Sequence, residues 1–178
     1  MTSLDMDTST GCLVDLETRT TVSDHQDLRL WLRLLACTNR VERHVRDRLR
    51  LEFETTLPRF DLMAQLERHP DGLRMSELSR RLMVSGGNVT GITDQLERES
   101  LVVRIVDPAD RRVVAVRLTV SGLARFREMA SRHERWIIEL LAGIDPQEKD
   151  AMFELLRKLK AHVSTLAVAA LAADGASA

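Results

Sequence analysis

One short polar segment of the sequence, SGGNVTG, has side chains suited to contact DNA. Asn88 offers a donor and an acceptor that match the edge of adenine, and Thr90 can contact a thymine methyl group or a phosphate. Glycines leave room for a close backbone approach, and a helix that begins here points its first N–H groups at phosphate. We therefore predict DNA contacts from Ser85, Gly87, Asn88, Thr90 and Gly91.

A second polar segment, DPADRR, separates two runs rich in valine. An arginine on a narrow loop can enter the minor groove of DNA, where A·T tracts deepen the negative potential. Phosphate would repel the carboxylate of Asp110, so we expect Asp110 to hold a neighbouring arginine in place. The predicted contacts of this region are Arg104, on the preceding run, with Asp110, Arg111 and Arg112.

Two short helices are expected to position the first segment. The sequence SELSRRLMV predicts one helix, capped by Ser76, and SGGNVTGITDQL predicts another, capped by Ser85. A short turn joins them, which is typical of a helix-turn-helix, whose second helix enters the major groove.

The two valine-rich runs, LVVRIV and VVAVRL, predict the strands of a β-hairpin. A single bridge near residues 73–75 is the only other β candidate. Helix, turn, helix, strand, arginine-tipped loop and strand follow one another in the order of a winged helix. That order, more than either segment alone, predicts DNA binding.

Long amphipathic helices are predicted at both ends of the chain. One covers residues 24–53, another starts at Thr119, and a third has Asp145 as its cap and Glu148 closing a capping box. Its alanine-rich end predicts fraying after about Ala169.

We therefore expect a mainly α fold, a winged helix-turn-helix with a two-stranded β-hairpin wing and a helical dimerisation domain formed by the N- and C-terminal helices. The predicted domains are a flexible arm at 1–23, helical dimerisation regions at 24–54 and 120–169, the winged domain at 55–119 and a flexible tail at 170–178.

Composition excludes several classes of protein. The formal net charge is −1, so attraction to nucleic acid must come from a few placed arginines. No apolar run is long enough for a membrane helix, and no secretory signal opens the chain. The two cysteines form no CxxC pair, which favours a reducing, cytoplasmic setting without a metal site. No HExxH, P-loop lysine or nucleophile elbow is present, so we expect no enzyme, catalytic residue or cofactor.

Over about residues 27–168 the chain resembles the MarR family of winged-helix regulators. The resemblance rests on LPRFDLMAQL, MSELSRRLMVSGGNVTGITDQLERE, the wing LVVRIVDPADRRVVAVRLT and the VSG that follows it. The most specific match is Asp-x-Arg at Asp110 and Arg112, followed by Leu118 and Thr119. The resemblance implies that Arg112 is the minor-groove arginine, Asp110 its orienting partner, and Arg111 a contact nearer the DNA backbone.

Two positions depart from the family pattern. Gly91 stands where relatives offer an arginine in the reading helix, and Ser100 stands where they have glycine before the wing. A residue other than glycine in a left-handed cap costs about 1 kcal/mol, which favours a different construction of this corner.

The resemblance also implies a two-fold dimer, formed by the terminal helices, on a pseudo-palindromic operator with half-sites about 10 bp apart. The open alternative is that the apolar stripes of these helices form an intramolecular core. Together these features lead us to expect a DNA-binding transcriptional regulator, of repressor type, whose partners are double-stranded DNA and a second copy.

Members of the family often release DNA when a small molecule binds between the dimer helices and the winged domain. An arginine row would suit an anionic effector, such as an aromatic acid or an aromatic CoA thioester. Ion pairing along the helix is the alternative role for these arginines. The candidate effector-binding residues are Trp31, Arg40, His44, Arg59 and His133.

Two alternative functions are a helical protein-interaction module without DNA binding and a thiol-based redox-sensing regulator. A helical protein-interaction module would explain the terminal helices but not the wing. In thiol-sensing relatives a reactive cysteine lies near the start of the first helix, where this chain has Leu32. Cys37 follows an apolar stretch, which predicts a buried, unreactive thiol, and Cys12 falls in the predicted arm.

Overall fold

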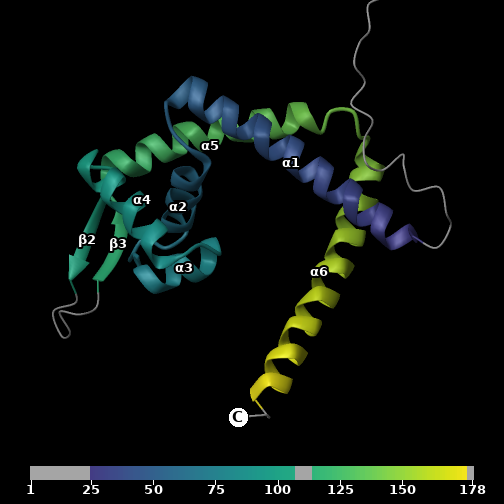
Figure 1. Cartoon of the computed structure of the whole chain (residues 1–178). Helices are drawn as coiled ribbons and strands as arrows, with labels where there is room; N and C mark the ends of the chain where they lie inside the picture. Colours follow the sequence, from purple (N-terminus) through teal and green to yellow (C-terminus); the bar gives the residue numbers. More distant parts are fainter. Residues whose placement is uncertain (1–24, 107–113, 176–178) are drawn as a thin grey trace, which may run out of the picture. The chain divides into compact units, whose positions relative to one another are not determined.

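The computed structural model describes residues 25–106 and 114–175, with side chains described up to residue 166. These residues fold into helices and a small sheet (Figure 1). They divide into two compact units, one that ends at Met129 and one that begins at Ala130. In chain order the elements are α1 (Gln26–Phe53), α2 (Leu57–Glu67), β1 (Leu73–Arg74), α3 (Met75–Leu82), α4 (Gly86–Arg98), β2 (Val102–Val106), β3 (Val114–Leu118), α5 (Val120–Leu140) and α6 (Pro146–Gly175).

The first unit is built on an apolar core. The rings of Phe60 in α2 and Phe126 in α5 lie with their centroids 5.4 Å apart. Each fully buried leucine contributes about 2 kcal/mol, so the stripes that predict the helices also hold them together. The core side chains of α1, α2 and α4 are Val45, Leu49, Phe53, Phe60, Leu62, Met63, Leu66, Val89, Ile92 and Leu96.

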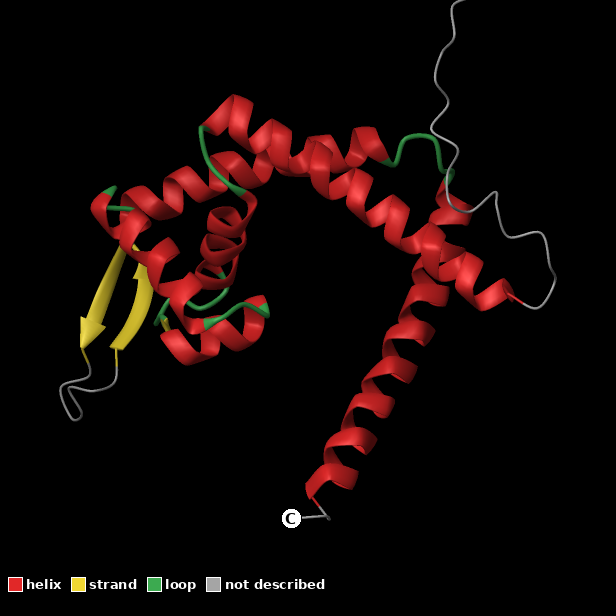
Figure 2. Cartoon of the chain, in the orientation of Figure 1, coloured by secondary structure: helices red, strands yellow, loops and turns green. Residues whose placement is uncertain are grey.

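The three strands form one antiparallel sheet in the order β1-β3-β2. Its β2–β3 hairpin is seen in yellow in Figure 2. The β2–β3 hairpin confirms the predicted wing. The predicted single bridge is in fact a two-residue strand, in which Leu73 pairs with Val116 and Arg74 with Ala115. Gly72, at φ +95°, makes this pairing close, because a Cβ there would lie 2.8 Å from the carbonyl oxygen of Val116.

Helix ends follow local capping chemistry in most places. The predicted box at α6 is confirmed, since the amide of Glu148 donates to Asp145 and the amide of Asp145 donates to Glu148, both at 2.9 Å. Ser76 as the cap of α3 is wrong. The chain passes from β1 straight into the helix at Met75, and the carboxylate of Glu77 accepts the N–H of Arg74 at 3.2 Å.

The end of the last helix also differs from the sequence-based expectation. α6 continues to Gly175, beyond the end predicted near Ala169. Alanine has the highest helix propensity, and that preference outweighs the fraying signal of the residues that follow. In the described part of the chain, no helix combines the length and the apolar character needed to cross a membrane.

Candidate nucleic-acid interface

α4 buries one side and exposes the other. Val89, Thr93 and Leu96 are fully buried against the core of the first unit. At 3.6 residues per turn, the opposite side carries Gly87, Gly91, Asp94 and Arg98 on successive turns, and all four are exposed. This outward face is the side of α4 that packing in the first unit leaves exposed.

Polar groups at the start of α4 are held by short local contacts. The N–H of Asn88 donates to the hydroxyl of Ser85 at 3.4 Å, which confirms Ser85 as the cap. The hydroxyl of Thr90 donates to the carbonyl oxygen of Gly86 at 2.9 Å, so its methyl group stays available for contact. Asn88 and Thr90 are both exposed, side by side with the glycines.

No packing contact within the described structure requires the glycines of α4. An added Cβ on Gly86, Gly87 or Gly91 would find no described atom within 4 Å. Each glycine in a helix costs about 1 kcal/mol relative to alanine. The open space lies outside the helix, which suits close approach of a second molecule.

The turn between α3 and α4 sets the direction in which α4, the predicted reading helix, leaves α3. Met83 is left-handed, at φ 54°, and its N–H donates to the carbonyl of Arg80. The hydroxyl of Ser79 donates to the carbonyl of Val84 at 2.6 Å. Sequence reasoning missed Ser79, because a mid-helix serine gives no local signal for a contact five residues away.

Arg104 lies on the helix-covered side of the wing. Its Cα partner on β3 is Val116, which is fully buried, and paired residues project from the same face of a sheet. The guanidinium accordingly reaches α4, where it pairs with Asp94 and Glu97. Hydrogen bonding to Asp94 raises the pKa of Arg104 above its ordinary value, burial opposes this, and the charges of both carboxylates add to it.

This position was not foreseen for Arg104, which we predicted as a DNA contact. Alternation along β2 could have placed it on the core side with Val102, but its partners required the fold. Three further predicted contacts, Asp110, Arg111 and Arg112, lie outside the described residues.

The corner before the wing keeps the left-handed conformation without a glycine. Ser100 has φ 60°, so the expectation of a different construction was wrong. The hydroxyl of Thr119 donates to the carbonyl of Ser100 at 2.7 Å, and the N–H of Thr119 donates to that of Leu101 at 3.0 Å. These bonds offset the strain at Ser100.

One of the predicted effector residues lines a pocket. Arg59 borders a space of about 290 Å³, together with Arg125, Glu99 and apolar side chains. Arg59 pairs with Glu99, while its Nε is buried without a hydrogen-bond partner among the described residues. Arg125, which sequence reasoning missed, donates to the carbonyl of Phe53 at 3.3 Å and stacks over its ring.

The other four effector candidates do not line this pocket. Trp31 and Arg40 are exposed on α1. The Nε2 of His44 is buried without a hydrogen-bond partner among the described residues. His133 lies edge-on to Trp136, with ring centroids 6.3 Å apart, and burial lowers its pKa.

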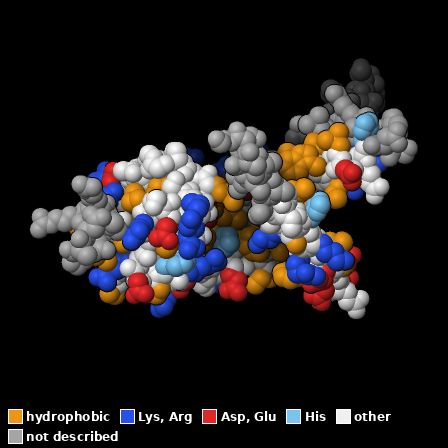
Figure 3. Space-filling model, turned by 90° about the horizontal axis from the view of Figure 1, so that it is seen from below, with side chains coloured by type: hydrophobic (Ala, Val, Ile, Leu, Met, Phe, Trp, Pro, Cys, Tyr) orange, Lys and Arg blue, Asp and Glu red, His pale blue; other side chains and the backbone are white. Residues whose placement is uncertain are grey.

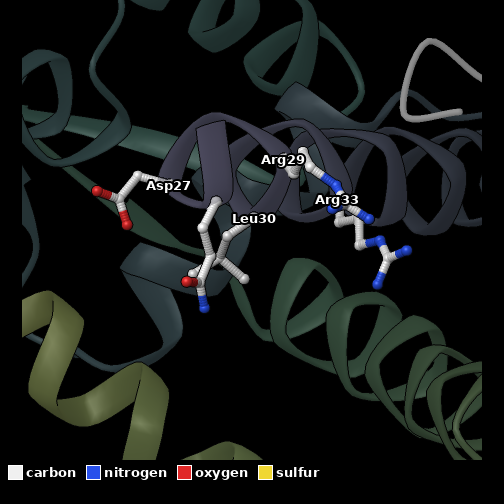
Figure 4. Close-up of a pocket in the computed structure, with 5 residues that line it drawn as sticks. Asp27, Arg29, Leu30 and Arg33 are labelled. Carbon is white, nitrogen blue, oxygen red and sulfur yellow. The ribbon is translucent and has the colours of Figure 1, made fainter. Parts of the chain in front are cut away.

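A second pocket, of about 510 Å³, lies along the first turns of α1 (Figure 4). The described residues that line it, Arg29 and Arg33 among them, all belong to this one helix. Further along α1, Cys37 is exposed, so its predicted burial was wrong. Leu35 and Ala36, just before it, lie on other sides of the helix, because successive residues are 100° apart.

Acidic and basic side chains are mixed on one face of the described part of the chain (Figure 3). In the face seen in Figure 3, the described basic side chains lie among acidic ones and form no continuous basic patch. This agrees with the net charge of −1. Any attraction for DNA therefore depends on local geometry.

Part of the sequence matches a known protein family. The family model for the MarR family matches residues 55–114. The uncharacterized HTH-type transcriptional regulator YkoM of Bacillus subtilis is 34% identical over 89 residues, which cover 50% of this chain and 58% of YkoM. The chain thus spans less than two thirds of the length of the first curated relatives it matches.

Solved structures extend the likeness over most of the chain. A MarR family transcriptional regulator from Silicibacter pomeroyi has a TM-score of 0.68 and 33% identity, covering 80% of this chain and 99% of that one. The MepR–DNA complex of Staphylococcus aureus has a TM-score of 0.63 and 22% identity, covering 75% and 96%. With its helix-turn-helix, its hairpin wing and this likeness, the chain belongs to the MarR family.

Proposed function

We propose that the protein is a sequence-specific DNA-binding transcriptional regulator that binds a pseudo-palindromic operator as a homodimer and represses transcription. The observation that carries the proposal is the outward face of α4. Asn88 and Thr90 are exposed on the two flanks of this face, beside glycines that no contact among the described residues requires. MepR, whose fold is similar, has been solved with DNA, which supports DNA binding by this chain.

In this proposal α4 enters the major groove. Asn88 pairs with an adenine, Thr90 meets a thymine methyl group, and the start of the helix with Ser85 receives a phosphate. The bare Cα atoms of Gly87 and Gly91 allow the DNA backbone to come close. By the family resemblance, the wing adds Arg112 in the minor groove, oriented by Asp110, and Arg111 at the backbone.

A selection experiment tests this. Random duplexes are enriched on the wild-type protein, and binding of the selected site is then measured against salt by fluorescence anisotropy. We expect a steep loss of affinity with salt. Asn88→Ala should weaken the selected site by roughly 5- to 100-fold and leave mixed-sequence DNA nearly unaffected.

The matched control is Asn39→Ala, at an exposed asparagine of α1. It should bind both DNAs as the wild type does. Failure to enrich any sequence, or binding that is indifferent to salt, would overturn the proposal.

The homodimer rests on the second unit. Among its described side chains, α6 exposes seven large apolar ones. A chain that left them in water would forgo about 1.5–3 kcal/mol for each one that could be buried. A second copy of the chain is the partner expected to bury these side chains, because two-fold symmetry would repeat the reading face for a pseudo-palindrome. The side chains are Met152, Phe153, Leu155, Leu156, Leu159, Val163 and Leu166.

We further propose that a small anionic effector, an aromatic acid or its CoA thioester, binds in the pocket of Arg59 and releases DNA. The buried Nε of Arg59 is a charged donor without a partner among the described residues, and a carboxylate would satisfy it. Aromatic acids and their CoA thioesters are titrated against the DNA-bound protein. Displacement by one of them, lost in Arg59→Met, supports the site, and indifference to all of them would overturn it.

A further inference from the structure

The reading helix carries more negative than positive charge. Arg98 is the single basic residue of α4, whereas Asp94 and Glu97 are both acidic. Asp94 lies on the outward face, with about half of its side chain exposed. Glu97 lies at the edge of that face and is partly exposed. Like charges repel when they are brought together at an interface, so these carboxylates oppose contact with phosphate.

One guanidinium from outside the helix meets both carboxylates. Arg104 reaches Asp94 through one terminal nitrogen and Glu97 through the other. The backbone N–H of Arg104 also donates to Glu97, at 3.4 Å. Arg98 contributes an Nε bond to the backbone carbonyl of Asp94 at 3.2 Å, which leaves that carboxylate to Arg104.

The position of Arg104 suits pairing with these two carboxylates better than it suits a contact with DNA. It projects from the face of the sheet that packs on α4, opposite Val116, and only 27% of its side chain is exposed. An arginine that contacts phosphate needs its charge free, whereas here two carboxylates already compensate it.

We propose that Arg104 is a positioning residue that screens the two carboxylates of α4 and so allows the outward face to approach DNA. This inference rests on the proposed DNA binding. It replaces a direct phosphate contact with an indirect role, and it also ties the first wing strand to the reading helix. Loss of Arg104 would leave two uncompensated negative charges beside the DNA.

A double-mutant cycle on the full chain tests the screen. The four proteins are the wild type, Arg104→Gln, the neutralised variant Asp94→Asn/Glu97→Gln, and the triple variant. Affinity is measured on a mixed-sequence duplex, where base-specific contacts do not contribute. Arg48→Gln, at an arginine of α1 paired with Glu52, is the matched control for the loss of one ion-paired positive charge.

We expect Arg104→Gln to weaken binding by at least about tenfold in the wild-type background and by less than about threefold in the neutralised one. The neutralised variant should bind at least as tightly as the wild type, and Arg48→Gln should change affinity by less than about twofold. If Arg104→Gln fails to fold, comparison of the neutralised variant with the wild type still separates a screen from a structural clamp.

Two results would overturn the inference. An equal or larger cost of Arg104→Gln in the neutralised background would make Arg104 a phosphate contact. A neutralised variant that binds about tenfold more weakly than the wild type would make the ion pairs a structural clamp alone. Failure of the wild type itself to bind DNA would instead overturn the proposed function.

Discussion

Gly122 in α5 lies directly against the carbonyl of Leu101, so closely that an added Cβ would sit 1.8 Å from the oxygen and 2.7 Å from the carbon. Leu101 precedes β2 and Gly122 lies in the first turn of α5, so the two residues meet at the corner between the wing and α5. Because the clash is with backbone, a rotamer change in a side chain cannot relieve it.

We therefore expect Gly122→Ala to lower the free energy of unfolding by about 3 kcal/mol or more, since the start of α5 must move away from Leu101. Denaturant titration measures the change. Gly143→Ala is the matched control, because a Cβ there meets no described atom within 4 Å. Equal stability of the two variants would mean that the corner is looser than the structure has it.

Replacement of Gly91 should have the opposite effect on stability from replacement of Gly122. Its surroundings are open, so Gly91→Ala should raise the free energy of unfolding by about 0.5–1 kcal/mol through helix propensity. The same methyl group should weaken DNA binding if the DNA backbone approaches this turn. Stability and affinity are measured on the same sample, and a variant that gains stability with no loss of affinity would place DNA elsewhere.

The acid response of α2 depends on Asp61. Burial, and then the charge of Glu42, raise the pKa of Asp61 above its ordinary 3.8. The folded state therefore holds the proton more tightly than the unfolded chain does. The stability this provides is complete below about pH 3.8 and is lost as pH rises through the folded-state pKa.

It follows that the ionised carboxylate of Asp61 destabilises the folded state near neutral pH. Asp61→Asn should raise the free energy of unfolding at pH 7 by less than about 1 kcal/mol, because water partly screens the site. The gain should shrink as pH falls toward 4. Thermal unfolding at several pH values measures it, with Asp47→Asn, at an exposed position of α1, as control. A gain that grows in acid would contradict the assignment.

The apolar stripe of α6 predicts the effect of a charge on association. Leu159→Asp should shift a dimer to monomer in sedimentation experiments, since a carboxylate would have to be buried at the interface. Ala161→Asp adds the same charge about 200° away around the helix and should leave association unchanged. A Leu159→Asp protein that remains dimeric would indicate that α6 does not form the interface.

Much of this fold follows from local sequence signals. The helices, the hairpin and the caps at Ser85 and Asp145 depend on residues a few positions apart, so spacing and side-chain type suffice to predict them. The resemblance of the wing and the reading helix likewise pointed to a family that the structure and the comparisons then confirmed.

Contacts between distant segments needed the tertiary structure. Arg104 reads in sequence as a basic residue on a wing strand, and only the pairing of β2 with β3 over α4 turns it toward Asp94 and Glu97. The sequence could not place Cys37 on an exposed side of α1 or show the approach of Gly122 to Leu101. Local spacing determines which side of an element is apolar, but the packing of elements decides which charge meets which.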